Sequence, residues 1–142
     1  MRRSGRGIRL GMTGLFHAHS GIRFLILLLA AVNVVVLGLG IVQKRPFGKL
    51  HRALGAIFAG SLHLQVVLGA TMVALGRYYP ALIGHMVMMV LAAVVAQVAM
   101  SVNRRRATPT LHIPLIGVLV ALLCIVGGVM SIGRGLFTMS AG

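Results

Sequence analysis

Residues 111–133 read LHIPLIGVLVALLCIVGGVMSIG, an apolar run without a single Lys, Arg, Asp or Glu. A helix of about 20 such residues crosses the roughly 30 Å hydrocarbon layer of a lipid bilayer. Three further runs of similar length and polarity occupy residues 20–42, 50–75 and 82–102. The sequence therefore predicts four transmembrane helices that pack as an all-α, integral membrane bundle.

The composition of the 142-residue chain supports the same class, because 58% of the residues are hydrophobic and only 10% are charged. This balance is atypical of soluble globular domains and of disordered chains. We expect a single transmembrane domain over residues 1–142, with the first run retained as an anchor because no small-residue cleavage site follows it. Cys124 is the only cysteine in the sequence, which excludes a disulfide framework and a cysteine-ligated metal.

The charge of the chain is one-sided, with 14 Lys and Arg, no Asp or Glu, and a formal net charge of +14. The basic residues cluster beside the ends of the apolar runs, so we expect contacts with anionic lipid and none with nucleic acid. Paired-acid catalysis and carboxylate-bound metals are excluded, since both need Asp or Glu. Counter-charge is expected from lipid, from an acidic partner subunit or from an anionic cofactor.

The segments between the apolar runs are short and contain turn-forming residues. These are Pro46, Gly48, Gly76, Pro80 and Pro109. Short connections place consecutive helices antiparallel and adjacent, which predicts an up-down-up-down bundle. Basic residues occur on both sides of the membrane, so the orientation stays open. The expected location is a bacterial inner membrane.

Five of the six histidines lie near the ends of the apolar runs. The antiparallel topology places His85 at the depth of His17 or His19, near one membrane surface. It places His51 at the depth of His112, near the other surface. The helices of each pair are diagonal in a square bundle, so the two imidazoles can ligate one planar b-type haem from both faces. The sequence therefore predicts two bis-histidine haems.

The predicted iron ligands are His19 with His85 and His51 with His112, and His17 remains an alternative to His19. Glycines and arginines beside these histidines fit a bound porphyrin. Gly21 and Gly55 each lie four residues after a candidate ligand, which leaves room one helical turn along the same face. Haem propionates are anionic, and we expect Arg23, Arg52 and Arg77 to bind them.

His63 is different, because it lies in the middle of the second apolar run. It is rotated by about 120° around the helix from His51, so the two cannot both face one haem squarely. We expect a hydrogen bond from His63 to a neighbouring helix or to the edge of a cofactor. A quinone-binding role is the alternative.

Two short stretches resemble known haem proteins. Residues 50–55 (LHRALG) and 64–69 (LQVVLG) are similar to the LH-x-x-LG and Q-x-x-G pattern of the cytochrome b561 family. This resemblance implies a four-helix core with two haems, whose ligand pairs lie on alternating helices. Residues 64–86 also resemble half of a haem A synthase, whose Q-x-x-LG … H pattern ends in a haem-ligating histidine. That second likeness implies His85 as a ligand with His19 as its partner, although the carboxylate that accompanies the synthase histidine is missing here.

These features predict a di-haem b-type cytochrome that transfers electrons across the membrane as a subunit of a larger respiratory or photosynthetic redox complex. A quinol or another redox subunit would be the donor or acceptor. Two alternatives stay open. One is a pigment-binding or structural membrane subunit, in which single outward-facing histidines ligate chlorophyll magnesium. The other is an enzyme of the haem-synthase or ferric-reductase kind, which needs an open coordination position or a substrate cleft.

Overall fold

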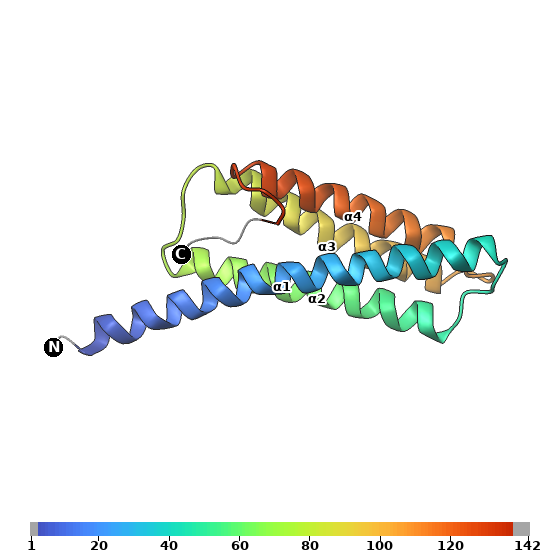
Figure 1. The fold of residues 1–142 in the computed structure, drawn as a ribbon, viewed down its shortest axis with the longest axis horizontal. Helices are drawn as coiled ribbons and strands as arrows, with labels where there is room; N and C mark the ends of the chain where they lie inside the picture. The colour runs from blue at the N-terminus through green and yellow to red at the C-terminus, as the bar shows by residue number, and fades with distance from the viewer. Residues whose placement is uncertain (1–2, 138–142) are drawn as a thin grey trace.

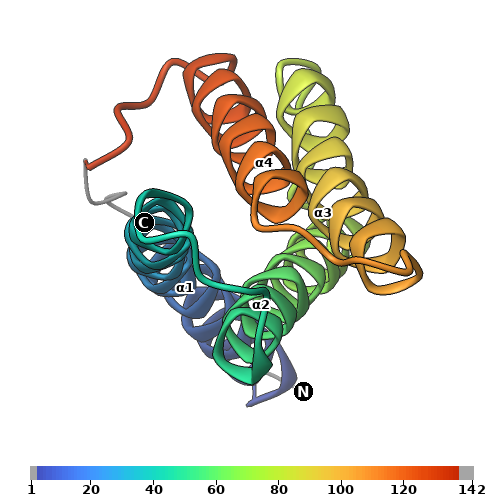
Figure 2. The same cartoon turned by 90° about the vertical axis from the view of Figure 1, so that its right-hand side faces the viewer.

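Four long helices lie side by side in the protein (Figure 1). The computed structural model describes residues 3–137, and for residues 3–9 the backbone only. The helices are α1 (Arg3–Val42), α2 (Lys49–Ala74), α3 (Leu82–Arg104) and α4 (His112–Met130). Their main contacts join α1 to α2, α2 to α3, α3 to α4 and α1 to α4, and Figure 2 shows this ring from one end. The predicted all-α up-down-up-down bundle is confirmed, with α1 diagonal to α3 and α2 diagonal to α4.

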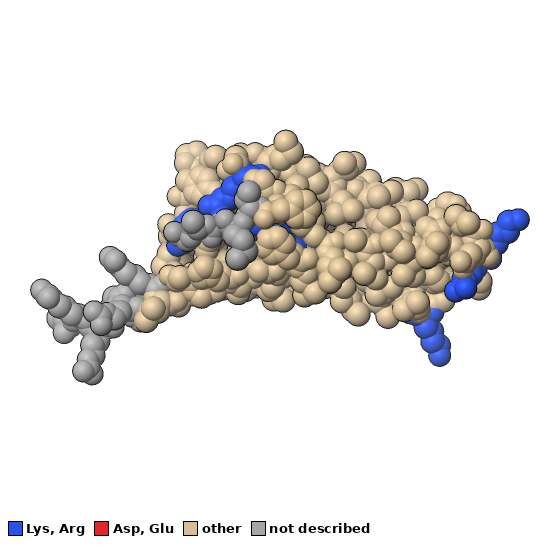
Figure 3. All heavy atoms as spheres, viewed as in Figure 1, with Lys and Arg blue, Asp and Glu red and all other residues tan. Residues whose placement is uncertain are grey.

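The surface of the bundle suits a membrane. All four helices contain a segment long and apolar enough to span a bilayer, and in α1 this segment is Leu10–Val42. Large side chains such as Leu28, Leu39 and Leu123 are exposed along the helices. On the face drawn in Figure 3, Lys and Arg gather at the two ends of the molecule. The protein is therefore a multi-pass membrane protein with four spans.

The bounds of α1 differ most from the prediction, because the helix begins at Arg3 and not near residue 20. The prediction followed the apolar run alone, whereas residues 3–19 contain no proline and continue the same helix. A helix of 40 residues is about 60 Å long, so its N-terminal part extends past the other helices (Figure 1). His17 and His19 consequently lie within α1 and not at its start. The ends of α2, α3 and α4 fall within about three residues of the predicted positions.

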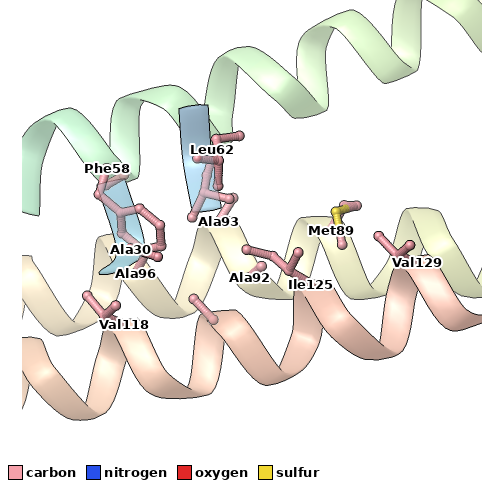
Figure 4. Packing of buried hydrophobic residues seen from close by; sticks show 13 residues of the cluster. Ala30, Phe58, Leu62, Met89, Ala92, Ala93, Ala96, Val118, Ile125 and Val129 are labelled. Atoms are coloured by element: carbon pink, nitrogen blue, oxygen red, sulfur yellow. The ribbon is translucent and has the colours of Figure 1, made fainter. Parts of the chain in front are cut away.

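Small side chains allow α3 and α4 to approach each other closely. Ala92, Ala93 and Ala96 of α3 are buried in the core (Figure 4). On α4, a Cβ atom added to Gly117 would overlap the methyl group of Ala99. In a membrane, such small residues let helices pack through van der Waals contact, since lipid gives no hydrophobic drive for helix association.

Two buried asparagines tie neighbouring elements together. The Nδ2 atom of Asn33 donates hydrogen bonds to the carbonyl oxygens of Leu29, at 2.8 Å, and of Leu54 on α2, at 3.3 Å. The Oδ1 atom of Asn103 accepts a bond of 2.9 Å from the backbone N–H of Thr110. The bond from Asn33 to Leu54 joins two helices, and an interhelical hydrogen bond contributes about 0.6–2 kcal/mol in membrane proteins. The bonds of the two asparagines fix the rotation of α1 against α2 and the start of α4 against the end of α3.

Candidate functional site

A cavity of about 240 Å³ lies between the four helices, towards the end at which α2 connects to α3. Its wall is mostly apolar and includes Leu62, Met89 and Ile125. Its charged and titratable lining consists of two histidines, three arginines and a tyrosine: His19, His85, Arg23, Arg77, Arg134 and Tyr79. An apolar cavity with a few convergent polar groups is the usual form of a ligand site.

The two histidines of this cavity face each other across the bundle. The ring centroids of His19 on α1 and His85 on α3 are 6.4 Å apart, and their planes meet at 70°. A metal ion held by two imidazoles on opposite sides separates the ring centroids by about 6.3 Å, given metal–nitrogen bonds of about 2.0 Å. The centroid separation of His19 and His85 is close to this value, and it also lies in the range of a direct edge-to-face ring contact.

His85 is oriented by a hydrogen bond from its second ring nitrogen. Its Nδ1 atom lies 2.9 Å from the carbonyl oxygen of Gly128 on α4. A carbonyl oxygen can only accept, so Nδ1 carries the proton and Nε2 keeps its lone pair in the neutral ring. Metal-ligating histidines usually make this bond, because it fixes both the tautomer and the ring orientation. His85 is thus prepared to ligate through Nε2.

His19 is positioned by two residues of α2. The Nε2 atom of Gln65 donates a 2.8 Å hydrogen bond to the backbone carbonyl of His19. A Cβ atom added to Gly69 would lie only 3.2 Å from Cε1 of the His19 ring, so the ring needs a residue without a side chain there. Both residues belong to the LQVVLG stretch, which gives that motif a physical role. Within the described residues, the buried Nδ1 atom of His19 has no hydrogen-bond partner.

Arginines make one end of the cavity positive. The guanidinium of Arg77 lies 4.7 Å from the centroid of the Phe16 ring, and that of Arg134 lies 5.8 Å from the same ring. Arg23 lies over Phe24 at 4.9 Å and also borders the cavity. The predicted arginines Arg23 and Arg77 thus lie at the cavity. Anionic groups of a ligand could bind to this cluster.

Sequence reasoning missed Arg134 as a site residue. It follows α4 in the segment that turns back towards the bundle after Met130 (Figure 1). The up-down topology places Arg134 on the same side of the membrane as Arg77, and this shared side could have identified Arg134 as a site residue. Gly69 and Gly128 were missed too, since only their contacts reveal which glycines adjoin a histidine.

His17 and Gly21 lie outside this cavity. His17 is exposed and contacts Phe16 edge to face, with ring centroids 5.9 Å apart. Gly21 is exposed as well, and an added Cβ atom would meet nothing within 4 Å. The glycine that adjoins the His19 ring is Gly69 and not Gly21.

The second predicted pair is not brought together. His51 is buried, and its Nδ1 atom accepts a 3.1 Å hydrogen bond from the backbone N–H of Gly48 at the start of α2. Its ring stacks on Phe47 at 5.8 Å. In a neutral ring with this bond, Nε2 carries the proton and is not a metal ligand. His112 is exposed, and no ring contact joins it to His51 in the part of the chain that the structure describes.

The remaining predicted residues lie on α2. Gly55 packs against the side chain of Met100 on α3, so it serves helix packing. Arg52 is exposed and borders a shallower groove between α2 and α3. His63 is exposed, and its Nδ1 atom lies 2.7 Å from the carbonyl oxygen of Ala59 in the preceding turn of the same helix.

The donor set limits what the cavity can hold. Over residues 3–137, no group of three or more His, Cys, Asp or Glu side chains could bind a metal ion. Two imidazoles alone leave most coordination positions of a transition metal empty. Two imidazoles could complete the coordination of a metal whose other ligands come from a cofactor such as a tetrapyrrole.

Comparison with known proteins gives no relative from which to transfer a role. No protein-family model, no curated protein and no solved structure matches the chain.

Proposed function

We propose that the protein is a membrane cytochrome that binds a b-type haem between His19 and His85 and takes part in electron transfer. The observation that carries this proposal is the facing histidine pair on diagonal helices, with ring centroids 6.4 Å apart beside the cavity. Bound haem supplies reversible one-electron chemistry at its iron.

The chain's own residues have distinct tasks in this proposal. His19 and His85 would ligate the haem iron. Gln65 and Gly128 hold the histidines through the backbone carbonyl of His19 and the Nδ1 atom of His85. The arginine cluster provides donors for two propionates. The wall of the cavity is mostly apolar, and a hydrophobic shell of this kind would influence the redox potential of a bound haem.

The resemblance of residues 50–55 and 64–69 to the cytochrome b561 family and to half of a haem A synthase supports the same proposal. The second haem, between His51 and His112, stays a prediction. It would require His51 to give up its bond to Gly48 and His112 to turn towards the bundle interior. Electron transfer across the whole membrane, a larger redox complex and a quinone partner likewise remain parts of the proposal.

The test is to purify the full chain in detergent from haem-replete membranes and to quantify haem by its pyridine haemochrome. We expect about one haem b per chain with a low-spin spectrum. His19→Ala and His85→Ala should lose it, and His17→Ala should keep it. Because His85→Ala could misfold, His85→Gly with added imidazole provides a second measurement, in which the spectrum should return. A helical, folded chain without haem would overturn the proposal.

One observation favours a second candidate, a pigment-binding subunit. His63 is exposed on α2, and its Nδ1 proton is bonded to Ala59, so Nε2 is left as an acceptor in a neutral ring. A single histidine of this kind could ligate the magnesium of a chlorophyll bound outside the bundle. Magnesium without iron in the purified protein, together with a pigment spectrum that is lost in His63→Leu, would favour this candidate over the cytochrome.

A further inference from the structure

A second hollow lies between α2 and α3, at the end of the bundle away from the histidine cavity. Two arginines, two small residues and two polar residues contribute most of its lining: Arg52, Arg104, Ala56, Gly60, Gln97 and Ser101. The two helices are antiparallel, and Arg52 is in the first turn of α2 while Arg104 is the last residue of α3. Both guanidinium groups therefore lie at the membrane-surface end of this α2–α3 groove.

The two arginines of the α2–α3 groove form a candidate anion-binding site. Both side chains are exposed, and the sequence contains no Asp or Glu that could pair with them. Guanidinium groups bind phosphate through paired hydrogen bonds, and two of them on adjacent helices can bind one phosphate from both sides.

Deeper than the arginines, the groove is lined by polar side chains on α3 and by small residues on α2. Along α3, Ser101 lies about 5 Å and Gln97 about 10 Å deeper than Arg104, at a rise of about 1.5 Å per residue. The Nε2 atom of Gln97 donates a 3.3 Å bond to Ser101 Oγ, so both polar side chains lie together at this depth. On α2, Ala56 and Gly60 are exposed, and a Cβ atom added to Gly60 would meet nothing within 4 Å. The floor of the groove is thus open to an apolar chain.

We propose that the α2–α3 groove is a binding site for an anionic phospholipid. Its phosphate lies between Arg52 and Arg104, its glycerol ester groups lie near Gln97 and Ser101, and an acyl chain runs along Ala56 and Gly60. Basic pockets between transmembrane helices bind acidic lipid head groups in this way. The site is independent of haem, since none of its residues borders the histidine cavity.

The experiment measures phosphatidylglycerol binding to the full chain in detergent by native mass spectrometry, with phosphatidylcholine as the neutral competitor. Arg52→Gln/Arg104→Gln should weaken phosphatidylglycerol binding by about tenfold or more, from roughly 1 kcal/mol per basic residue near the head group. The matched control is Arg105→Gln/Arg106→Gln, which removes the same charge at the same membrane surface from exposed residues outside the groove.

Equal losses in the two double variants would overturn the proposal, because they would indicate general attraction to surface charge. No preference for phosphatidylglycerol over phosphatidylcholine would overturn it as well. Gly60→Leu keeps both arginines and fills the floor of the groove, so it should reduce lipid binding. In a separate measurement on the unmodified chain, inorganic phosphate should fail to displace the lipid. Complete displacement by inorganic phosphate would reduce the groove to an anion site and contradict a bound lipid.

Discussion

The two histidines of the cavity are held by different means. His85 makes a direct hydrogen bond from its ring to Gly128, which fixes the tautomer. Among residues 3–137 the Nδ1 atom of His19 has no such bond; Gln65 holds its backbone, and the missing side chain at Gly69 gives its ring room. The position of the His19 ring therefore depends more on the room beside Gly69 than on a hydrogen bond. Filling that space should displace the ring.

Gly69→Val tests this at the scale of one residue. The added Cβ atom would come within 3.2 Å of the His19 ring, so we expect the ring to shift and haem content to fall by at least about half while the helical circular dichroism is kept. The control is Gly21→Val, because Gly21 is exposed with open space around it. Equal haem content in the two variants would contradict the role given to Gly69.

At the scale of the helices, glycine and alanine set how closely elements pack. The contact of Gly117 on α4 with Ala99 on α3 leaves no room for another methyl group, and the Ala99 methyl group is attached directly to the backbone and cannot rotate away. At Gly55, by contrast, the opposing atoms belong to the flexible side chain of Met100. The cost of adding a methyl group should therefore differ between these two glycines.

We expect Gly117→Ala to destabilise the bundle by about 1–3 kcal/mol, the range for overpacked cores. Thermal unfolding in detergent, followed by circular dichroism, measures the effect, and Gly38→Ala serves as the control because its Cβ position is open. The exchange Gly117→Ala/Ala99→Gly returns the methyl volume to its original total. If this double variant is no more stable than Gly117→Ala alone, the close contact is not the cause.

The start of α2 offers a test of the second haem. The backbone N–H of Gly48 donates a hydrogen bond to His51, three residues after the N-cap. A glutamine side chain at that position can accept the same bond, so His51→Gln should preserve the cap. His51→Ala removes it and should cost about 0.5–2 kcal/mol in the unfolding transition. If His51 serves only as a cap, haem content is the same in both variants and in the parent chain. A loss of one haem in His51→Gln would instead support the predicted ligation by His51 and His112.

In the molecule as a whole, charged side chains lie at the two ends of the bundle and apolar surface lies along the helices between them. Connections alternate between the two ends (Figure 1), and the visible Lys and Arg gather at those ends (Figure 3). The connection after α1 and the connection after α3 lie on one membrane side, and the connection after α2 lies on the other. This arrangement follows from four spans joined by short turns.

Single cysteines can check this topology. In a Cys124→Ser background, we expect Arg45→Cys and Arg105→Cys to react with a membrane-impermeant maleimide from the same side. Tyr78→Cys should react only from the opposite side, since all three positions are exposed in connections. Labelling of intact cells compared with inverted vesicles measures this. Reaction of positions 45 and 105 from opposite sides would be incompatible with the bundle.

The sequence by itself determined the number of helices, their antiparallel order and the depth of each histidine. A bilayer requires about 20 apolar residues per span, and this constraint can be read from a run such as residues 111–133. It could not determine where α1 begins, because residues 3–19 are helical without being uniformly apolar.

Only the tertiary structure decided which histidines face each other. Depth follows from position along a helix, but direction follows from rotation about its axis, which side-chain packing fixes. His17 and His19 are about 200° apart around α1, so only one of them can face the cavity, and it is His19. His51 is buried and bonded to Gly48 whereas His112 is exposed, and no spacing of histidines along the chain contains that information.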